Sequence, residues 1–174
     1  VNLQASIDKV KAADVIVFAG GISPSLEGEE MPVNAEGFKG GDRTTIELPA
    51  IQRRLISELK KLGKPIIFVN YSGSAVGLEP ESKICDAILQ AWYPGQAGGT
   101  AVADVLFGYY NPSGKLPVTF YKHTDQLPDF QDYSMKGRTY RYMTESPLYS
   151  FGHGLSYTNF TYGPATLSQQ TISQ

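Results

Sequence analysis

Carboxylates are concentrated in one stretch of the chain, residues 22–47. The stretch holds six acidic side chains against two basic ones: Glu27, Glu29, Glu30, Glu36, Asp42 and Glu47 against Lys39 and Arg43. Carboxylates crowded into a closing site disfavour one another's ionisation, which suits one of them to act as a general acid. The alternative is an acidic loop exposed to solvent, and the spacing alone leaves both interpretations open.

Other kinds of site are disfavoured by the residues present. The chain has no GxGxxG and no lysine-bearing phosphate loop, and neither Ser72 nor Ser74 lies in a GxSxG motif. His123 and His153 lack the spacing of a metal-binding pair, and the single cysteine, Cys85, excludes a thiolate metal cluster. We therefore expect no cofactor and no metal, and interpret both histidines as structural and Cys85 as a small buried hydrophobe.

Composition narrows the classes of partner. The 174 residues include 15 Lys and Arg against 17 Asp and Glu, so no basic field exists to hold nucleic acid or an anionic membrane. The sequence contains no uninterrupted run of about 18 apolar residues, so it predicts no membrane span. The length of 174 residues predicts one domain with a tail, and a 41% share of apolar residues is enough to form a sizeable core. The chain begins at Val1 without an initiator Met, which is compatible with a lost signal peptide.

Hydrophobic patterns predict the elements that must position the acidic stretch. Apolar residues at helical spacing predict helices over 2–12, 49–63 and 96–107. Unbroken apolar runs predict buried strands over 13–19, 66–70, 87–92 and 116–120. This alternation predicts an α/β sandwich, a mostly parallel sheet flanked by helices on both faces, with an irregular C-terminal extension. Ligands bind beyond the carboxyl ends of such strands, which is where the acidic stretch follows the first strand.

Two further features of the C-terminal part are predicted. From Tyr121 on, scattered aromatic residues and prolines indicate an irregular segment that packs over the sheet or reaches a neighbour. The tail is rich in Ser, Thr and Gln, and residues 165–172 fit a lone edge strand that needs a partner.

Five ordered blocks of sequence carry a resemblance to a known family. They are SPSLEGEE, GGDRTTIELPAIQRRLI, AWYPGQAGGTAVADVLFGYYNPSGKLPVTF, GRTYRYM and YSFGHGLSYTNF, spread over residues 13–160. Together they resemble glycoside hydrolase family 3, the exo-acting β-glucosidases and β-xylosidases, and most of all its xylosidase-like branch.

The resemblance implies a modular retaining hydrolase that acts on an oligosaccharide or glycoside. It implies a catalytic Asp nucleophile on an N-terminal barrel domain, absent from these residues, and an acid/base Glu on a loop of this domain. The family's Glu-x-Glu pattern points to Glu29, with Glu27 and Glu30 as alternatives. Such an enzyme needs its two carboxyl groups about 5 to 5.5 Å apart, so the isolated chain is expected to be inactive.

The resemblance also implies domain bounds and a location. Residues 1–158 correspond to the α/β sandwich domain, and residues 159–174 to a linker and the start of a truncated fibronectin-like domain. Enzymes of this kind are exported, which implies a periplasmic or secreted protein. A chain that acts alone as a carbohydrate-binding or protein-interaction module is the non-catalytic alternative.

Several residues of the five sequence blocks could have either a functional or a structural role. Asp42 and Arg43 either touch sugar or form an ion pair that pins the loop, and we expect the ion pair. The tyrosines of the C-terminal blocks either stack on a sugar ring or pack against a neighbouring module. They are Tyr109, Tyr110, Tyr140 and Tyr142.

Overall fold

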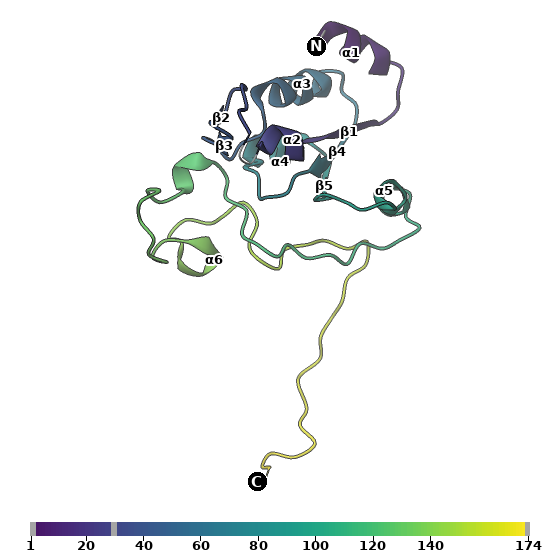
Figure 1. The fold of residues 1–174 in the computed structure, drawn as a ribbon. Coiled ribbons are helices and arrows are strands. Elements are labelled where there is room, and N and C mark those ends of the chain that lie inside the picture. Colours follow the sequence, from purple (N-terminus) through teal and green to yellow (C-terminus); the bar gives the residue numbers. More distant parts are fainter. Residues whose placement is uncertain (1–2, 29–30, 173–174) are drawn as a thin grey trace.

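A three-stranded parallel sheet forms the centre of the chain. The computed structural model describes residues 3–28 and 31–172. The strands are β1 (Ile16–Gly21), β4 (Ile66–Tyr71) and β5 (Ala87–Gln90), in the spatial order β1-β4-β5 (Figure 1). Ile16 is paired with Ile66, and Ile67 with Ala87, so the three strands end at the same edge of the sheet.

Helices cover the sheet. The helices α1 (Leu3–Val10) and α3 (Ala50–Lys60) lie together on one side of the strands, and α4 (Glu79–Ile84) contacts α3. The helix α5 (Gly98–Leu106) lies on the side away from α1 and α3 (Figure 1). The predicted α/β sandwich is therefore confirmed.

The core consists of two clusters that share helix α3. Ile56 packs in a cluster with Phe68, and Leu59, three residues later on the same stripe, packs in a second cluster with Ile66. All four side chains are at most 4% exposed. Each such side chain contributes roughly 1.5 to 3 kcal/mol by burial, so α3 stabilises both halves of the sheet.

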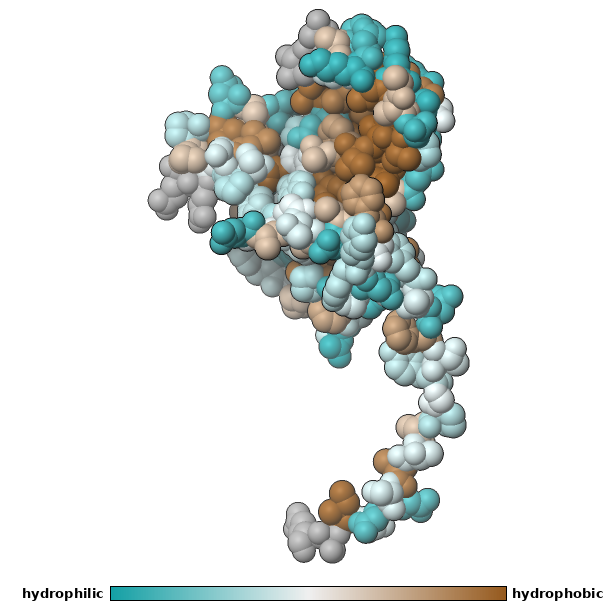
Figure 2. All heavy atoms as spheres, turned by 90° about the vertical axis from the view of Figure 1, so that its right-hand side faces the viewer, coloured by the Kyte–Doolittle hydropathy of each residue, from teal (hydrophilic) through white to brown (hydrophobic). Residues whose placement is uncertain are grey.

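One side of the molecule leaves apolar side chains at the surface. Figure 2 shows hydrophobic atoms gathered in a broad area below the N-terminal helix. Two valines at β1, Val15 and Val17, are 46% and 52% exposed. In the described chain β1 pairs only with β4, so it forms an edge of the sheet.

The predicted strand over residues 116–120 is wrong. Phe120 and Tyr149 form an isolated antiparallel bridge, and Leu116 exchanges backbone hydrogen bonds with the segment Gly152–His153. Pro117 lies between these two points and has no N–H to donate, which prevents a continuous ladder. Residues 165–172, predicted to be an edge strand that needs a partner, are exposed and form no strand in the chain by itself, so that prediction stays open.

The C-terminal part follows an irregular path. After α5 it contains only a 3-10 helix, η1 (Thr124–Gln126), and a short helix, α6 (Thr139–Tyr142), among the described residues. Residues 161–172 extend away from the rest of the chain (Figure 1). The predicted irregular extension is therefore present.

Candidate active site

Three loops meet beyond the carboxyl ends of the strands. The loop after β1 carries the short helix α2 (Pro24–Glu27), the loop after β4 carries Ser74, and the loop after β5 carries Tyr93. This is the edge where ligands bind in open parallel sheets.

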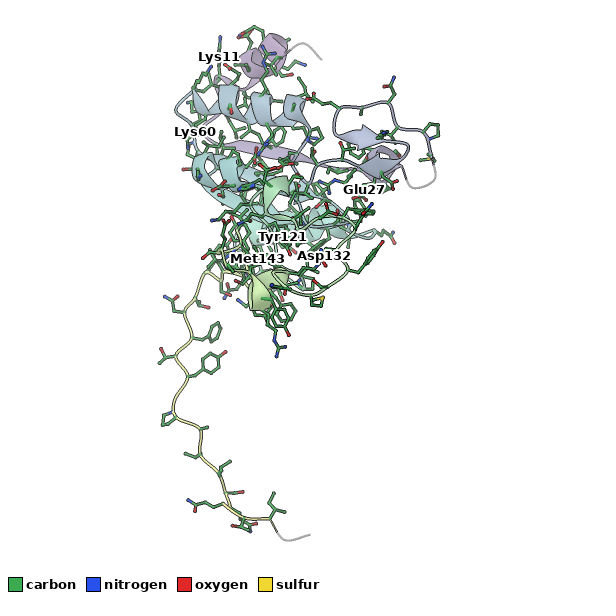
Figure 3. All side chains as sticks on the ribbon, turned by 90° about the vertical axis from the view of Figure 1, so that its left-hand side faces the viewer. Lys11, Glu27, Lys60, Tyr121, Asp132 and Met143 are labelled. Atoms are coloured by element: carbon green, nitrogen blue, oxygen red, sulfur yellow. The ribbon has the colours of Figure 1, made fainter. Side chains whose placement is uncertain are left out.

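Glu27 is held by side chains from both neighbouring loops. The Tyr93 hydroxyl lies 2.8 Å from Oε2 of Glu27, and the Ser74 hydroxyl donates to Oε1 at 3.1 Å. Figure 3 shows Glu27 at the end of the sheet, close to the hairpin of β2 (Phe38–Lys39) and β3 (Asp42–Arg43). Both carboxylate oxygens therefore have a hydroxyl neighbour.

Local sequence fixes the place of Glu27 on its loop. Ser23 caps α2 by accepting a hydrogen bond from the Leu26 amide at 3.2 Å, and Pro24 occupies the first turn. Gly28 ends the helix in the left-handed region, at φ 59°. A Cβ at Gly28 would lie 2.0 Å from Cγ2 of Val33, so both the backbone angle and the space require glycine there.

Tyr93 reaches the site from a strained turn. Its predecessor Trp92 has φ 54°, an angle that costs a residue with a side chain about 1 to 3 kcal/mol. The Trp92 ring packs edge-on against Phe120, with centroids 6.0 Å apart. Burial, together with the hydrogen bond to Glu27, raises the pKa of Tyr93 to about 12. Tyr93 therefore keeps its proton at neutral pH.

Gly73 makes room for the contact between Tyr93 and Glu27. A Cβ at Gly73 would lie 2.5 Å from Cε2 of Tyr93 and 3.1 Å from Oε2 of Glu27. A larger residue there would force the two side chains to shift.

Arg43 adds a positive charge beside this cluster. Its Nη1 donates to the Ser74 hydroxyl at 3.1 Å, and its Nε donates to the Thr45 carbonyl at 3.2 Å. Burial lowers the pKa of Arg43, while the charges of Glu27 and Glu47 oppose that shift. The predicted Asp42–Arg43 ion pair is wrong, because within the described residues Arg43 turns to Ser74 and backbone carbonyls instead.

A buried polar network supports the loop after β4. Nδ2 of Asn70 donates to Gln90 at 2.6 Å and to the Ser72 hydroxyl at 3.2 Å. The Ser72 hydroxyl donates to the Ser74 carbonyl at 2.9 Å, which fixes the loop that presents the Ser74 side chain. Asn70 and Ser72 are fully buried, so these bonds hold in an interior of low dielectric.

Glu47, the last carboxylate of the acidic stretch, is a structural residue here. Its two oxygens accept hydrogen bonds from the Thr124 amide at 2.8 Å and the Thr124 hydroxyl at 2.6 Å. Burial acts to raise the pKa of Glu47, but the hydrogen bonds to its carboxylate, together with the charge of Arg53, hold the pKa below its ordinary value. Glu47 therefore fastens the irregular segment to the loop that ends at α3.

A hollow of about 600 Å³ opens beside Arg43. The rings of Phe130 and Tyr133, which are 90% and 87% exposed, contribute to its wall. Its other lining residues are Arg43, Thr44, Thr45, Ile46, Thr124, Leu127, Pro128 and Arg138. Aromatic faces beside guanidinium groups are suited to bind a sugar ring and its hydroxyls.

Of the three glutamates predicted as candidates for the acid/base, the structure describes one. Glu29 and Glu30 lie outside the described residues. Glu27 lies in the cluster described above, where Tyr93 and Ser74 were not predicted. The signal that could have found them is their place directly after the second and third predicted strands.

Two of the other residues singled out from the sequence, His153 and Tyr140, pack against aromatic rings. The His153 ring stacks on Tyr149 at 4.7 Å, and Tyr140 stacks on Phe151 at 5.9 Å. Cys85 is half-buried between the two core clusters, and burial raises its pKa to about 11. In the described part of the chain no helix has the length and hydrophobicity needed to cross a membrane.

Comparison with known proteins places this chain in a family. Residues 1–157 match the family model of the glycosyl hydrolase family 3 C-terminal domain. The chain is 63% identical over 171 residues to a xylan 1,4-β-xylosidase of Xylanibacter ruminicola, covering 98% of this chain and 20% of that protein. It is 41% identical over 187 residues to a periplasmic β-glucosidase of Salmonella typhimurium, covering 98% of this chain and 23% of that protein.

A solved structure has the same fold. A β-glucosidase from Erythrobacter marinus is 39% identical and superposes with a TM-score of 0.74, over 92% of this chain and 21% of that one. The chain spans about a fifth of the length of the curated relatives that it matches. By its matched residues and its fold, this chain belongs to the C-terminal domain family of glycosyl hydrolase family 3.

Proposed function

We propose that this chain is the acid/base domain of a retaining exo-β-glycosidase, which removes terminal β-linked xylose or glucose from oligosaccharides. The observation that carries the proposal is the acidic stretch at the carboxyl end of β1, with Glu27 held there by Tyr93 and Ser74. The names of the relatives, a xylan 1,4-β-xylosidase and a β-glucosidase among them, support the substrate class.

The proposed chemistry needs two carboxyl groups from two domains. A nucleophilic Asp on an N-terminal barrel attacks the anomeric carbon, while a Glu of this domain protonates the leaving oxygen and later deprotonates the attacking water. The isolated chain holds one of the two groups and is therefore inactive. The barrel domain is its partner, and the hollow beside Arg43 holds the leaving-group sugar.

The acid/base is one of the three glutamates from Glu27 to Glu30. The Glu-x-Glu pattern supports Glu29, whereas the described geometry supports Glu27, because hydroxyl groups from two other loops hold its carboxylate. Domain bounds at residue 158, with a truncated fibronectin-like domain beyond it, and an exported location complete the proposal. The name of the Salmonella relative supports a periplasmic location.

Glutamine variants of the full-length enzyme test the assignment. E27Q, E29Q and E30Q are compared on substrates with poor leaving groups and on activated aryl glycosides. The variant of the acid/base loses about 10²- to 10⁴-fold in kcat/KM on poor leaving groups and keeps kcat/KM on activated ones, which need no protonation. E36Q, an exposed glutamate of the same stretch, is the matched control. Full activity of all three variants would contradict the proposal.

A binding module without catalysis is the second candidate function. The exposed rings of Phe130 and Tyr133 beside the hollow favour it, since such rings bind sugars without any nucleophile. Calorimetric titration of the chain with xylo- and gluco-oligosaccharides tests this candidate. Tight binding, together with a start codon close to Val1 in the source DNA, would favour the module over the enzyme domain.

A further inference from the structure

The lining of the hollow beside Arg43 carries positive charge without a carboxylate to balance it. It contains two arginines, Arg43 and Arg138, and no Asp or Glu among the described residues. Neither arginine forms an ion pair in the part of the chain that the structure describes, where the ion pairs are made by other residues. In a chain of net charge −2, two such guanidinium groups at one hollow form a local positive site that can take an anion.

The Arg138 guanidinium has N–H groups left for a ligand. Its Nε donates to the Ser134 carbonyl at 2.8 Å, and its Nη2 donates to the Asp132 carbonyl. A guanidinium carries five N–H groups in a planar fork, and these two hydrogen bonds use two of them. Within residues 3–28 and 31–172, Nη1 forms no hydrogen bond. The backbone therefore holds the guanidinium in place and leaves Nη1 for a ligand with planar oxygens, such as a carboxylate.

The acidic residues of the same segment are turned to their own backbone. Oδ1 of Asp129 accepts a hydrogen bond from the Gln131 amide, and Oδ1 of Asp132 accepts one from the Ser134 amide, each at 2.8 Å. The hydrogen bonds to Ser134, and after them the charge of Arg138, lower the pKa of Asp132. Neither carboxylate lines the hollow, so the free donors of Arg138 are not occupied by the acidic groups beside it.

Arg43 connects the hollow to Glu27. Its Nη1 donates to the Ser74 hydroxyl at 3.1 Å, and that hydroxyl donates to Oε1 of Glu27 at 3.1 Å. A sugar in the hollow would therefore lie next to one of the proposed acid/base glutamates. The exposed rings of Phe130 and Tyr133 offer flat faces for that sugar.

We propose that the hollow selects leaving groups that carry a carboxylate, so that the enzyme prefers glycosides of a uronic acid, and that Arg138 binds this carboxylate. The inference rests on the proposed function, which places the leaving-group sugar in the hollow. The sugar ring lies against the aromatic side chains, and its carboxylate accepts hydrogen bonds from Arg138. A charge-assisted hydrogen bond of this kind gives a preference of about tenfold over the corresponding neutral sugar.

A matched pair of disaccharides tests the proposal in the full-length enzyme. Both carry the terminal β-linked xylose or glucose that the enzyme releases, one on glucuronic acid and the other on glucose, so they differ only in a carboxylate against a CH₂OH group. We expect kcat/KM to be about tenfold higher on the acidic disaccharide. The preference should shrink between about 0.05 and 0.5 M NaCl, because salt screens charges at the surface. Equal kcat/KM on the two disaccharides would overturn the proposal.

Variants of Arg138 separate carboxylate binding from a merely structural role. R138Q should lower kcat/KM about tenfold on the acidic disaccharide and much less on the neutral one. R138K, which keeps the charge and loses the planar fork, should keep part of the preference. R141Q is the matched control, since Arg141 lies on the exposed α6 outside the lining, and it should behave as wild type. An equal loss on both disaccharides in R138Q would mean that Arg138 only holds its own segment.

The proposed function and this inference fail separately. Equal kcat/KM on the two disaccharides leaves the proposed function in place, whereas a full-length protein inactive on every β-xyloside and β-glucoside removes it. Where the disaccharides are not hydrolysed, calorimetric titration of the full-length protein with glucuronic acid, glucose 6-phosphate and glucose tests the hollow. Tighter binding of glucuronic acid than of glucose, lost in R138Q, supports the site. Equal binding of the three, or binding of the phosphate alone, overturns it.

Discussion

Arg53 of α3 donates from its Nε to Oε1 of Glu81 of α4 at 3.0 Å, and the Glu81 side chain is only 1% exposed. This ion pair joins the two helices that pack together on one face of the sheet. The second oxygen of Glu81 is buried without a hydrogen-bond partner among the described residues, so the carboxylate depends on Arg53.

Removal of Arg53 should therefore destabilise the fold strongly. R53A leaves a buried carboxylate without its cation, and we expect the free energy of unfolding to fall by about 3 kcal/mol in urea titrations. The double change Arg53→Met with Glu81→Leu should cost less, because no charge stays buried. K83A, which removes an exposed pair with Glu79, is the control and should change little. A loss in R53A no larger than in K83A would contradict the buried pair.

A Cβ at position 73 should disturb the site without touching the core. G73A places a methyl group 2.5 Å from the Tyr93 ring, which pushes Tyr93 away from Glu27. We expect kcat/KM of the full-length enzyme on poor leaving groups to fall about tenfold, because the hydrogen bond between Tyr93 and Glu27 is lost. G99A is the matched control, since a Cβ there meets nothing within 4 Å, and it should keep activity. Wild-type activity in G73A would mean that the loop adjusts freely.

Stability should decline in alkaline solution because of Cys85. Burial raises the pKa of its thiol in the folded chain from 9.0 to about 11. The contribution of Cys85 to the free energy of unfolding is fully present below pH 9. It is lost as the pH rises toward 11, because the thiol of the unfolded chain releases its proton at a lower pH than the thiol of the folded chain. C85A should therefore flatten the fall in unfolding free energy between these values. The native thiol should also react with a disulfide reagent at pH 8 roughly 100-fold more slowly than the thiol in urea.

Because of Glu47, the stability of the fold should decrease as the pH falls in the acidic range, which is opposite to the effect of Cys85 in alkaline solution. The pKa of Glu47 is lowered in the folded chain from 4.5, so its contribution is present above that value and is lost as the pH falls through the folded value. T124V removes the hydroxyl that bonds Oε2 of Glu47. The stability difference between wild type and T124V should be largest near neutral pH and should shrink in acid. T124S, which keeps the hydroxyl, should behave as wild type in the same urea titrations.

Long periodic elements could be predicted from the sequence, whereas short ones could not. The stripe of Leu3, Ile7 and Val10 predicted α1, and the apolar run of β4 predicted a central strand. The helix α2 has only four residues, too few for a hydrophobic period, and it depends on the Ser23 cap. The strand predicted near Leu116 failed at Pro117, where tertiary pairing needed an N–H that proline lacks.

The carboxylate of the site could be predicted, but its partners could not. Glu27 lies in the acidic stretch that the sequence singled out, while Ser74 and Tyr93 follow it by 47 and 66 residues. They meet because the strand order β1-β4-β5 brings three loops to one edge, and sequence patterns do not specify that order. The bent path of Trp92 is likewise set by its packing on Phe120.

The isolated bridge between Phe120 and Tyr149 closes a long excursion of the chain over the surface. Once the two ends of such an excursion are fixed, each doubling of its length costs only about 0.6 kcal/mol in closure entropy. The segment that lines the hollow with Phe130 and Tyr133 lies within it. Residues can therefore be inserted or deleted in this wall of the hollow at little cost to the sheet, so the shape of the hollow can change while the sheet is kept.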